Sequence, residues 1–193
     1  ARANVQFGED KTAVGALALR YSTSGSNNSA FGRETLYSNT TGHANVAVGH
    51  HALHDNSTGY ENIAIGSRAL ASNTTGYTNI AIGRVALASC TTSYANLAIG
   101  DYALNAHSYG AFNVAIGDQA NEYGTSSFNT VALGYNTNIT ASDQVRIGNS
   151  SITSIGGYTN WTNVSDGRFK TNVSENVLSL IHLSEPTRPS SIA

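Results

Sequence analysis

The chain has 193 residues, of which only 11% are charged, and a formal net charge of −2 at pH 7. Its scattered Lys and Arg residues form no basic stripe, so the composition disfavours nucleic acid as a partner. No apolar run reaches the length of a membrane-spanning helix, and the first residues show no leader pattern. The single Cys90 cannot form an internal disulfide, and we expect it to be a free structural thiol.

Glycine recurs at a fixed interval through most of the chain. Seven equal intervals are followed by one shorter interval. The repeated glycines are Gly15, Gly32, Gly49, Gly66, Gly83, Gly100, Gly117, Gly134 and Gly148. A period of this length is typical of solenoids, in which each repeat is one coil.

Each repeat contains a short segment with strand periodicity. In Asn62-Ile63-Ala64-Ile65-Gly66 the branched residues alternate with small ones, which predicts a strand with one Val/Ile face and one face of small residues. Clusters such as 56–60 predict turns. The sequence therefore predicts an all-β parallel solenoid of 17-residue coils over residues 1–148.

Other Asn-rich segments are also interpreted as turns. The Asn-X-Ser/Thr triplets that begin at Asn39, Asn73 and Asn138 are expected to be solvated.

The predicted core of one coil is thin. It contains four apolar side chains, for example Ile63, Ile65, Ala69 and Leu70, which are too few to order a coil by themselves, so the coils must stack. Alanine at the strand centre and glycine at its end would let another backbone approach. We therefore expect several chains to share the core, with a homotrimer as the simplest arrangement.

Two columns of polar or aromatic residues follow the period. Tyr60, Tyr77, Tyr94 and Phe128 lie eleven residues after a repeat glycine, with His43 at the equivalent position. They are candidate receptor-binding residues, and the alternative is a stacked corner that packs against its neighbours.

A hydroxyl residue lies eight positions after each of eight repeat glycines: Thr23, Thr40, Ser57, Thr74, Thr91, Ser108, Thr125 and Ser142. Such rows occur on ice-binding solenoids, which makes ice binding an alternative function. Trimeric hexapeptide-type acyltransferases are a second alternative, but no period of six residues is present.

Three histidines have a spacing that suggests metal ligands: His50, His51 and His54. The next repeat has Ser67-Arg68 and Ala71 at these positions, so we interpret the histidines as variable surface residues. Neither a metal nor a cofactor is expected.

The pattern Asn-aliphatic-Ala-aliphatic-Gly followed by Ala resembles the head repeats of trimeric autotransporter adhesins and similar repeats of phage tail fibres. The resemblance covers about Thr12 to Gly148, although only the last and shorter interval, from Gly134 to Gly148, has the length usual in that family. It implies a left-handed parallel β-roll that packs into a trimeric rod. The longer repeat is expected to enlarge the outward loop.

The run Ser165-Asp166-Gly167-Arg168-Phe169-Lys170-Thr171-Asn172-Val173 resembles the start of the S74-type peptidase, the intramolecular chaperone of endosialidase-like tailspikes. In that family the chaperone assembles the trimer and then cuts itself off. The resemblance implies Ser165 as the nucleophile, Lys170 as its base and cleavage between Ser165 and Asp166. A Lys can serve in this way if partial burial lowers its pKa.

Few residues follow this motif, so we expect the chaperone to be truncated here, and at most a single-turnover endopeptidase in a longer parent. The last segment resembles a translated sequencing adapter. The predicted organisation is a β-roll at 1–148, a neck at 149–164, a truncated chaperone start at 165–177 and a non-native tail at 178–193.

Together these features predict a structural and adhesive fibre protein rather than a turnover enzyme. The expected location is extracellular, on a virion tail fibre or a bacterial cell surface. The expected partners are further copies of the chain and a host or cell-surface receptor, glycans included.

Overall fold

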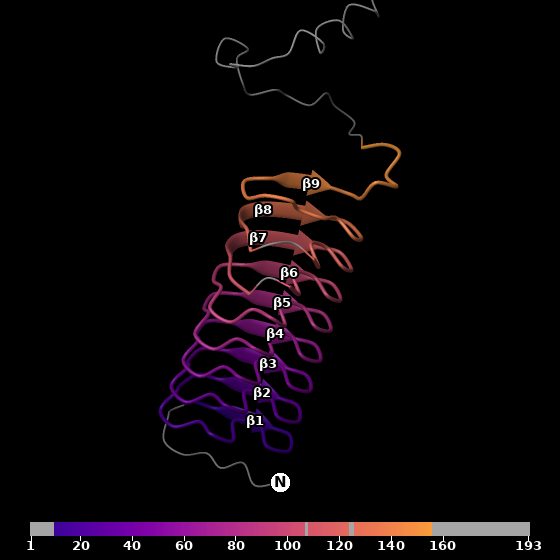
Figure 1. Ribbon diagram of the computed structural model, residues 1–193. Coiled ribbons are helices and arrows are strands. Elements are labelled where there is room, and N and C mark those ends of the chain that lie inside the picture. The colour runs from indigo at the N-terminus through magenta and orange to yellow at the C-terminus, as the bar shows by residue number, and fades with distance from the viewer. Residues whose placement is uncertain (1–9, 107, 124–125, 156–193) are drawn as a thin grey trace, which may run out of the picture. The chain divides into compact units, whose positions relative to one another are not determined.

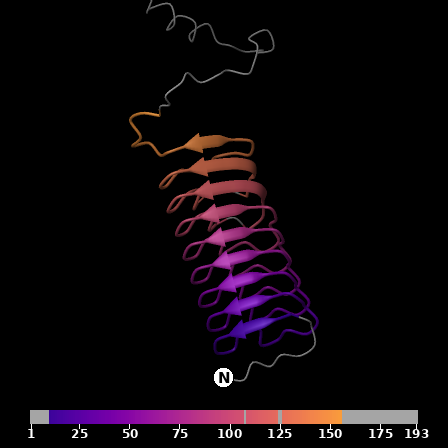
Figure 2. The same cartoon turned by 180° about the vertical axis from the view of Figure 1, so that it is seen from behind.

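A computed structural model describes residues 10–106, 108–123 and 126–155. These residues form an all-β parallel solenoid, as the sequence predicts, and contain no helix that could cross a membrane. The chain divides into two units, Ala1–Ser154 and Ile155–Ala193, and the solenoid belongs to the first. Figure 1 shows its strands as a column of arrows that point the same way, and Figure 2 shows the same column from behind.

One sheet of nine strands follows the chain order. The strands are β1 (Thr12–Val14), β2 (Ser29–Phe31), β3 (Val46–Val48), β4 (Ile63–Ile65), β5 (Ile80–Ile82), β6 (Leu97–Ile99), β7 (Ala111–Ile116), β8 (Phe128–Leu133) and β9 (Val145–Ile147). Residues that pair between neighbouring strands are 17 positions apart in the sequence, as in Ala64 and Ala81. Between β8 and β9 the last repeat is shorter, and Val131 pairs with Val145. Each side chain therefore lies over its equivalent in the next coil.

The chain leaves each strand through a glycine that no other residue could replace without strain. Gly66 has a φ of 133°, and a Cβ there would clash with the carbonyl oxygen of Gly83 in the next coil. Arg68 and Leu70 then adopt left-handed conformations, with φ of 60° and 50°. Leu70 is fully buried in the core that follows this turn.

The core differs from the prediction in one respect. Ala64, Ala69 and Leu70 are fully buried, but Ile65 is 39% exposed and Ile63 is half-buried. The expectation that both isoleucines face the core is therefore wrong. The central alanines of β2 to β8 are buried and fill this chain's own core instead of an interchain contact.

Buried asparagines link successive coils. Asn62 is typical: its Nδ2 donates to Oδ1 of Asn45 at 3.1 Å and to the carbonyl oxygen of Gly76 at 2.9 Å. Its Oδ1 accepts from the backbone N–H of Asn79 at 3.0 Å and from Nδ2 of Asn79 at 3.1 Å. The same column contains Asn28, Asn45, Asn62, Asn79, Asn96 and Asn113. These amides satisfy backbone groups that the tight corner leaves without a partner.

A second asparagine column contradicts the interpretation of the Asn-X-Ser/Thr triplets. Asn39 and Asn73 are fully buried, and Asn56 between them donates to Oδ1 of Asn39 at 2.7 Å; Asn138, in contrast, is exposed. The next member of the column is Cys90, which is fully buried, and burial raises the pKa of its thiol. The burial of Cys90 agrees with the expectation of a free structural thiol.

Candidate functional site

The predicted tyrosine row forms a continuous stack. Ring centroids are 4.9 Å apart between Tyr60 and Tyr77 and 5.0 Å apart between Tyr77 and Tyr94, with interplanar angles of 5° in both pairs. His43 extends the stack at 5.0 Å from Tyr60. The rings stack because the coil register places equivalent residues directly over one another.

Stacking determines which part of each ring is available to a ligand. Both faces of Tyr77 are covered by its neighbours, so a sugar could not lie flat on that ring. The three tyrosines are half-exposed, and within the described residues no hydrogen bond engages their hydroxyl groups. The row therefore presents a line of phenol hydroxyls and ring edges.

Phe128 is not part of this stack. It begins β8, is 48% exposed and pairs with Ala111, which itself bridges to Tyr94. The small Ala111 thus separates Phe128 from the tyrosines. The ring next to Tyr94 is Phe112, which meets it edge-on at 5.5 Å. Phe112 lies twelve residues after its repeat glycine instead of eleven, so the period of the row does not predict it.

The hydroxyl column has a structural role in several coils. Thr40, Ser57 and Thr74 each donate a side-chain hydrogen bond, at 2.9, 3.0 and 3.0 Å, to a backbone carbonyl of the next coil. Thr91 does the same at 3.2 Å. Because these hydroxyl protons hold coils together, they are not available to order an ice lattice, which weakens the ice-binding alternative.

The outward side of the sheet carries two apolar columns, called here the outer apolar face. One contains Val46, Ile63, Ile80, Leu97, Val114, Val131 and Val145, and the other contains Val14, Phe31, Val48, Ile65, Ile82, Ile99, Ile116, Leu133 and Ile147. None of these residues is buried in the single chain, and Val145 is 69% exposed. A parallel sheet normally has both faces covered, and this one has only its inner face covered.

The histidines that the sequence interpretation set aside lie close to an acidic residue of the preceding coil. Nε2 of His51 contacts Oε2 of Glu34, and one ligand atom from each of Glu34, His51 and His54 lies within 4.8 Å of the other two. A hydrogen bond from Arg33 lowers the pKa of Glu34, and burial lowers that of His50. Glu34 precedes His51 by one full repeat, a signal that the sequence carries.

Two predicted residues cannot be placed. Ser165 and Lys170, with the bond between Ser165 and Asp166, lie outside the described residues.

Neither the protein-family models nor the curated proteins include a match to this chain.

Proposed function

We propose that this chain is a structural and adhesive segment of an extracellular fibre, such as a phage tail fibre or a bacterial surface adhesin. The observation that supports it best is the outer apolar face, which follows all nine strands of the sheet. A soluble monomer rarely leaves so long an apolar surface in contact with water. Assembly through this face would give a stiff, repetitive shaft.

The proposed assembly is a homotrimer. Three copies whose outer apolar faces turn towards a common axis would cover every face and leave none for further growth. This interface differs from the one expected from the sequence, because the central alanines are already buried within one chain. The resemblance to adhesin head repeats favours threefold over twofold closure.

The adhesive part of the proposal assigns receptor contact to the tyrosine row. Stacked rings lose little conformational freedom on binding, and their hydroxyls can donate to or accept from glycan or protein groups. Phe128 is a separate, exposed candidate on β8.

Binding of the labelled chain to a printed glycan array and to a panel of bacterial cells tests this assignment. Tyr77→Ala should weaken binding to any surface that the wild type recognises. Tyr135→Ala is the matched control, because Tyr135 is also exposed, at 59%, but lies outside the row. Equal loss in both variants, or no loss in either, would remove the row from the proposal and leave the shaft.

For a longer parent chain we also propose self-cleavage between Ser165 and Asp166, with Lys170 as the base. The support is the motif at residues 165–173. A parent that includes a complete chaperone domain should be cut, and Ser165→Ala should prevent the cut. Intact mass measured for both proteins decides this point, and an uncut wild type would contradict it.

A further inference from the structure

A cluster of metal-ligating side chains lies on two neighbouring coils, apart from the tyrosine row. Glu34 is on one coil, and His51 and His54 are on the next. Their ligand atoms lie within 4.8 Å of one another. We propose that these three residues bind a divalent transition-metal ion of the Zn²⁺ class. Two imidazoles and a carboxylate form a ligand set that Zn²⁺ uses when its fourth position is open.

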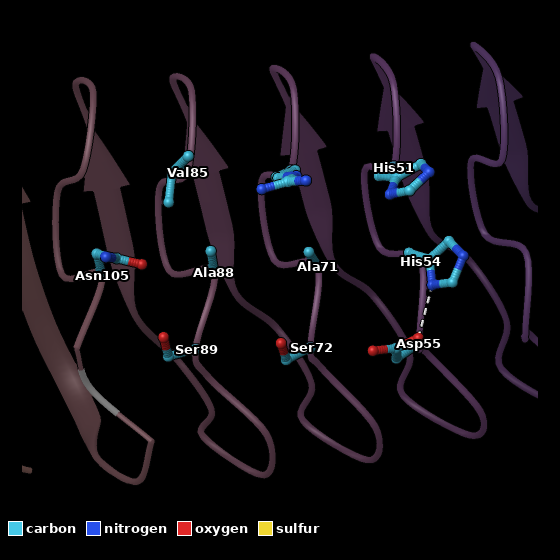
Figure 3. Close-up of a pocket in the computed structure, with 10 residues that line it drawn as sticks. His51, His54, Asp55, Ala71, Ser72, Val85, Ala88, Ser89 and Asn105 are labelled. Atoms are coloured by element: carbon cyan, nitrogen blue, oxygen red, sulfur yellow. Dashed lines mark hydrogen bonds and ion pairs between the residues drawn. The ribbon is translucent and has the colours of Figure 1, made fainter.

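The ring of His54 is held in one orientation. Its Nδ1 lies 2.6 Å from Oδ1 of Asp55, and its ring stacks on Tyr37 with centroids 4.9 Å apart and an interplanar angle of 6°. The bond to Asp55 leaves Nε2 as the free ring nitrogen. A carboxylate that holds the second nitrogen of a ligating histidine fixes its tautomer and raises its basicity. Figure 3 shows the bond between His54 and Asp55, with Asp55 below His54 and His51 above it.

Glu34 offers one oxygen to the site. Arg33 donates to Oε1 through Nε at 3.0 Å and through Nη2 at 2.8 Å, while Oε2 meets Nε2 of His51. Arg33 therefore orients the carboxylate without occupying the oxygen that faces the histidine. An ion would take the place of the hydrogen bond between Oε2 and Nε2, and the neutral ring of His51 would then carry its proton on Nδ1.

The surface next to the cluster leaves room for a fourth ligand. A groove of about 430 Å³ begins at His51 and His54 and continues over Ala71 and Ala88 to Asn105 (Figure 3). The groove forms there because the residues one and two repeats after His54 are small: Ala71 and Ala88. Water or a side chain from another molecule could complete a tetrahedral shell there.

The proposed ion would also connect two coils. Glu34 and His51 occupy the same column, one repeat apart, so the ion would bridge two turns of the solenoid in addition to the backbone ladder. Because the ion binds only the folded register, saturating Zn²⁺ should raise the unfolding temperature.

The test is calorimetric titration of the untagged full chain, freed of metal with a chelator, with Zn²⁺. We expect one ion per chain, and His51→Ala and His54→Ala should each weaken binding at least about 100-fold, since loss of a mere outer-shell partner costs roughly 10–100-fold. His43→Ala is the matched control: His43 is stacked on Tyr60 and lies outside the cluster. Its affinity for Zn²⁺ should equal that of the wild type.

Glu34→Gln keeps the test decisive if a histidine variant fails to fold, because the amide preserves the shape of the side chain and removes the anionic ligand. Circular dichroism checks its fold, and Co²⁺ reports the geometry through its visible absorption. Weaker Zn²⁺ binding and loss of tetrahedral Co²⁺ bands in this variant would support the site. No Zn²⁺ binding by the wild type, or equal binding by wild type and Glu34→Gln, would overturn it.

Discussion

The buried amide of Asn62 offers the sharpest test of how the coils are held together. Asn62→Asp changes one NH₂ group to oxygen and leaves the size of the side chain almost unchanged. Asn62 donates two hydrogen bonds, to Oδ1 of Asn45 and to the carbonyl oxygen of Gly76; the ionised variant loses both, and the protonated variant keeps one O–H donor and loses one. Both forms keep the acceptor for Asn79. The change therefore isolates the donor function of the column.

The expected decrease in the free energy of unfolding has two parts. Both acceptors keep another donor, the backbone N–H of Asn62 for Asn45 and Nδ2 of Asn73 for Gly76, so the one hydrogen bond that the protonated acid loses costs about 1 kcal/mol. Keeping a buried carboxyl protonated at pH 7 costs up to about 4 kcal/mol, from its unfolded pKa of roughly 3.9. The sum is about 5 kcal/mol at pH 7.

The pH dependence follows from the sign of the shift. Burial raises the folded-state pKa of the new carboxyl, so the folded chain holds a proton that the unfolded chain releases. Above about pH 3.9 the penalty grows by about 1.4 kcal/mol per pH unit until the folded pKa is reached, and near pH 3.5 only about 1 kcal/mol remains.

The assay is urea unfolding of wild type and variant at equal concentration from pH 3.5 to 7.5, followed by circular dichroism. Asn27→Asp is the matched control, because it makes the same change at an exposed residue with a φ of 58°, which Asp tolerates. The control should lose little stability at any pH. A pH-independent penalty for Asn62→Asp, or equal losses in both variants, would refute a buried donor column.

Four further predictions concern the glycine corner, the buried thiol and the hydroxyl column. Gly66→Ala should cost about 2–5 kcal/mol in urea unfolding, because its φ is 133° and the new Cβ would meet the carbonyl oxygen of Gly83; unchanged stability would contradict the close approach. Cys90 should not react with a thiol reagent until denaturant is added, since it is buried with a raised pKa, and rapid labelling of the native chain would be the contrary result. Thr74→Val should lower the free energy of unfolding by about 1 kcal/mol, because it removes the hydrogen bond to the carbonyl oxygen of Thr91. The wild type should show no thermal hysteresis, and its presence would support the ice-binding alternative.

The sequence predicted the solenoid, its period and its parallel strands correctly, because a glycine at the same place in every repeat constrains the backbone directly. It did not reveal which side of the strand faces inwards. Alternation in a segment such as 62–66 separates two faces but assigns neither to the core. The small face is inside, where the central alanines of β2 to β8 are buried and fill the core.

The burial of polar side chains was harder to predict from the sequence. Asn39 and Asn73 lie among Ser, Thr and Gly, a composition that favours exposed turns, yet stacking converts their side chains into interior links. The cluster of Glu34 with His51 was missed for a related reason. Residues one repeat apart are neighbours in space, and the local spacing of the histidines does not include Glu34, which lies 17 residues before His51.

The mass of the native chain in solution tests the proposed fibre most directly. Light scattering after gel filtration should give three chains of 20.1 kDa each, about 60 kDa. Ile65→Lys places a charge on the outer apolar face, at a side chain 39% exposed in the single chain, and should give a smaller species that remains folded. A wild type that stays at 20.1 kDa at high concentration would contradict the account.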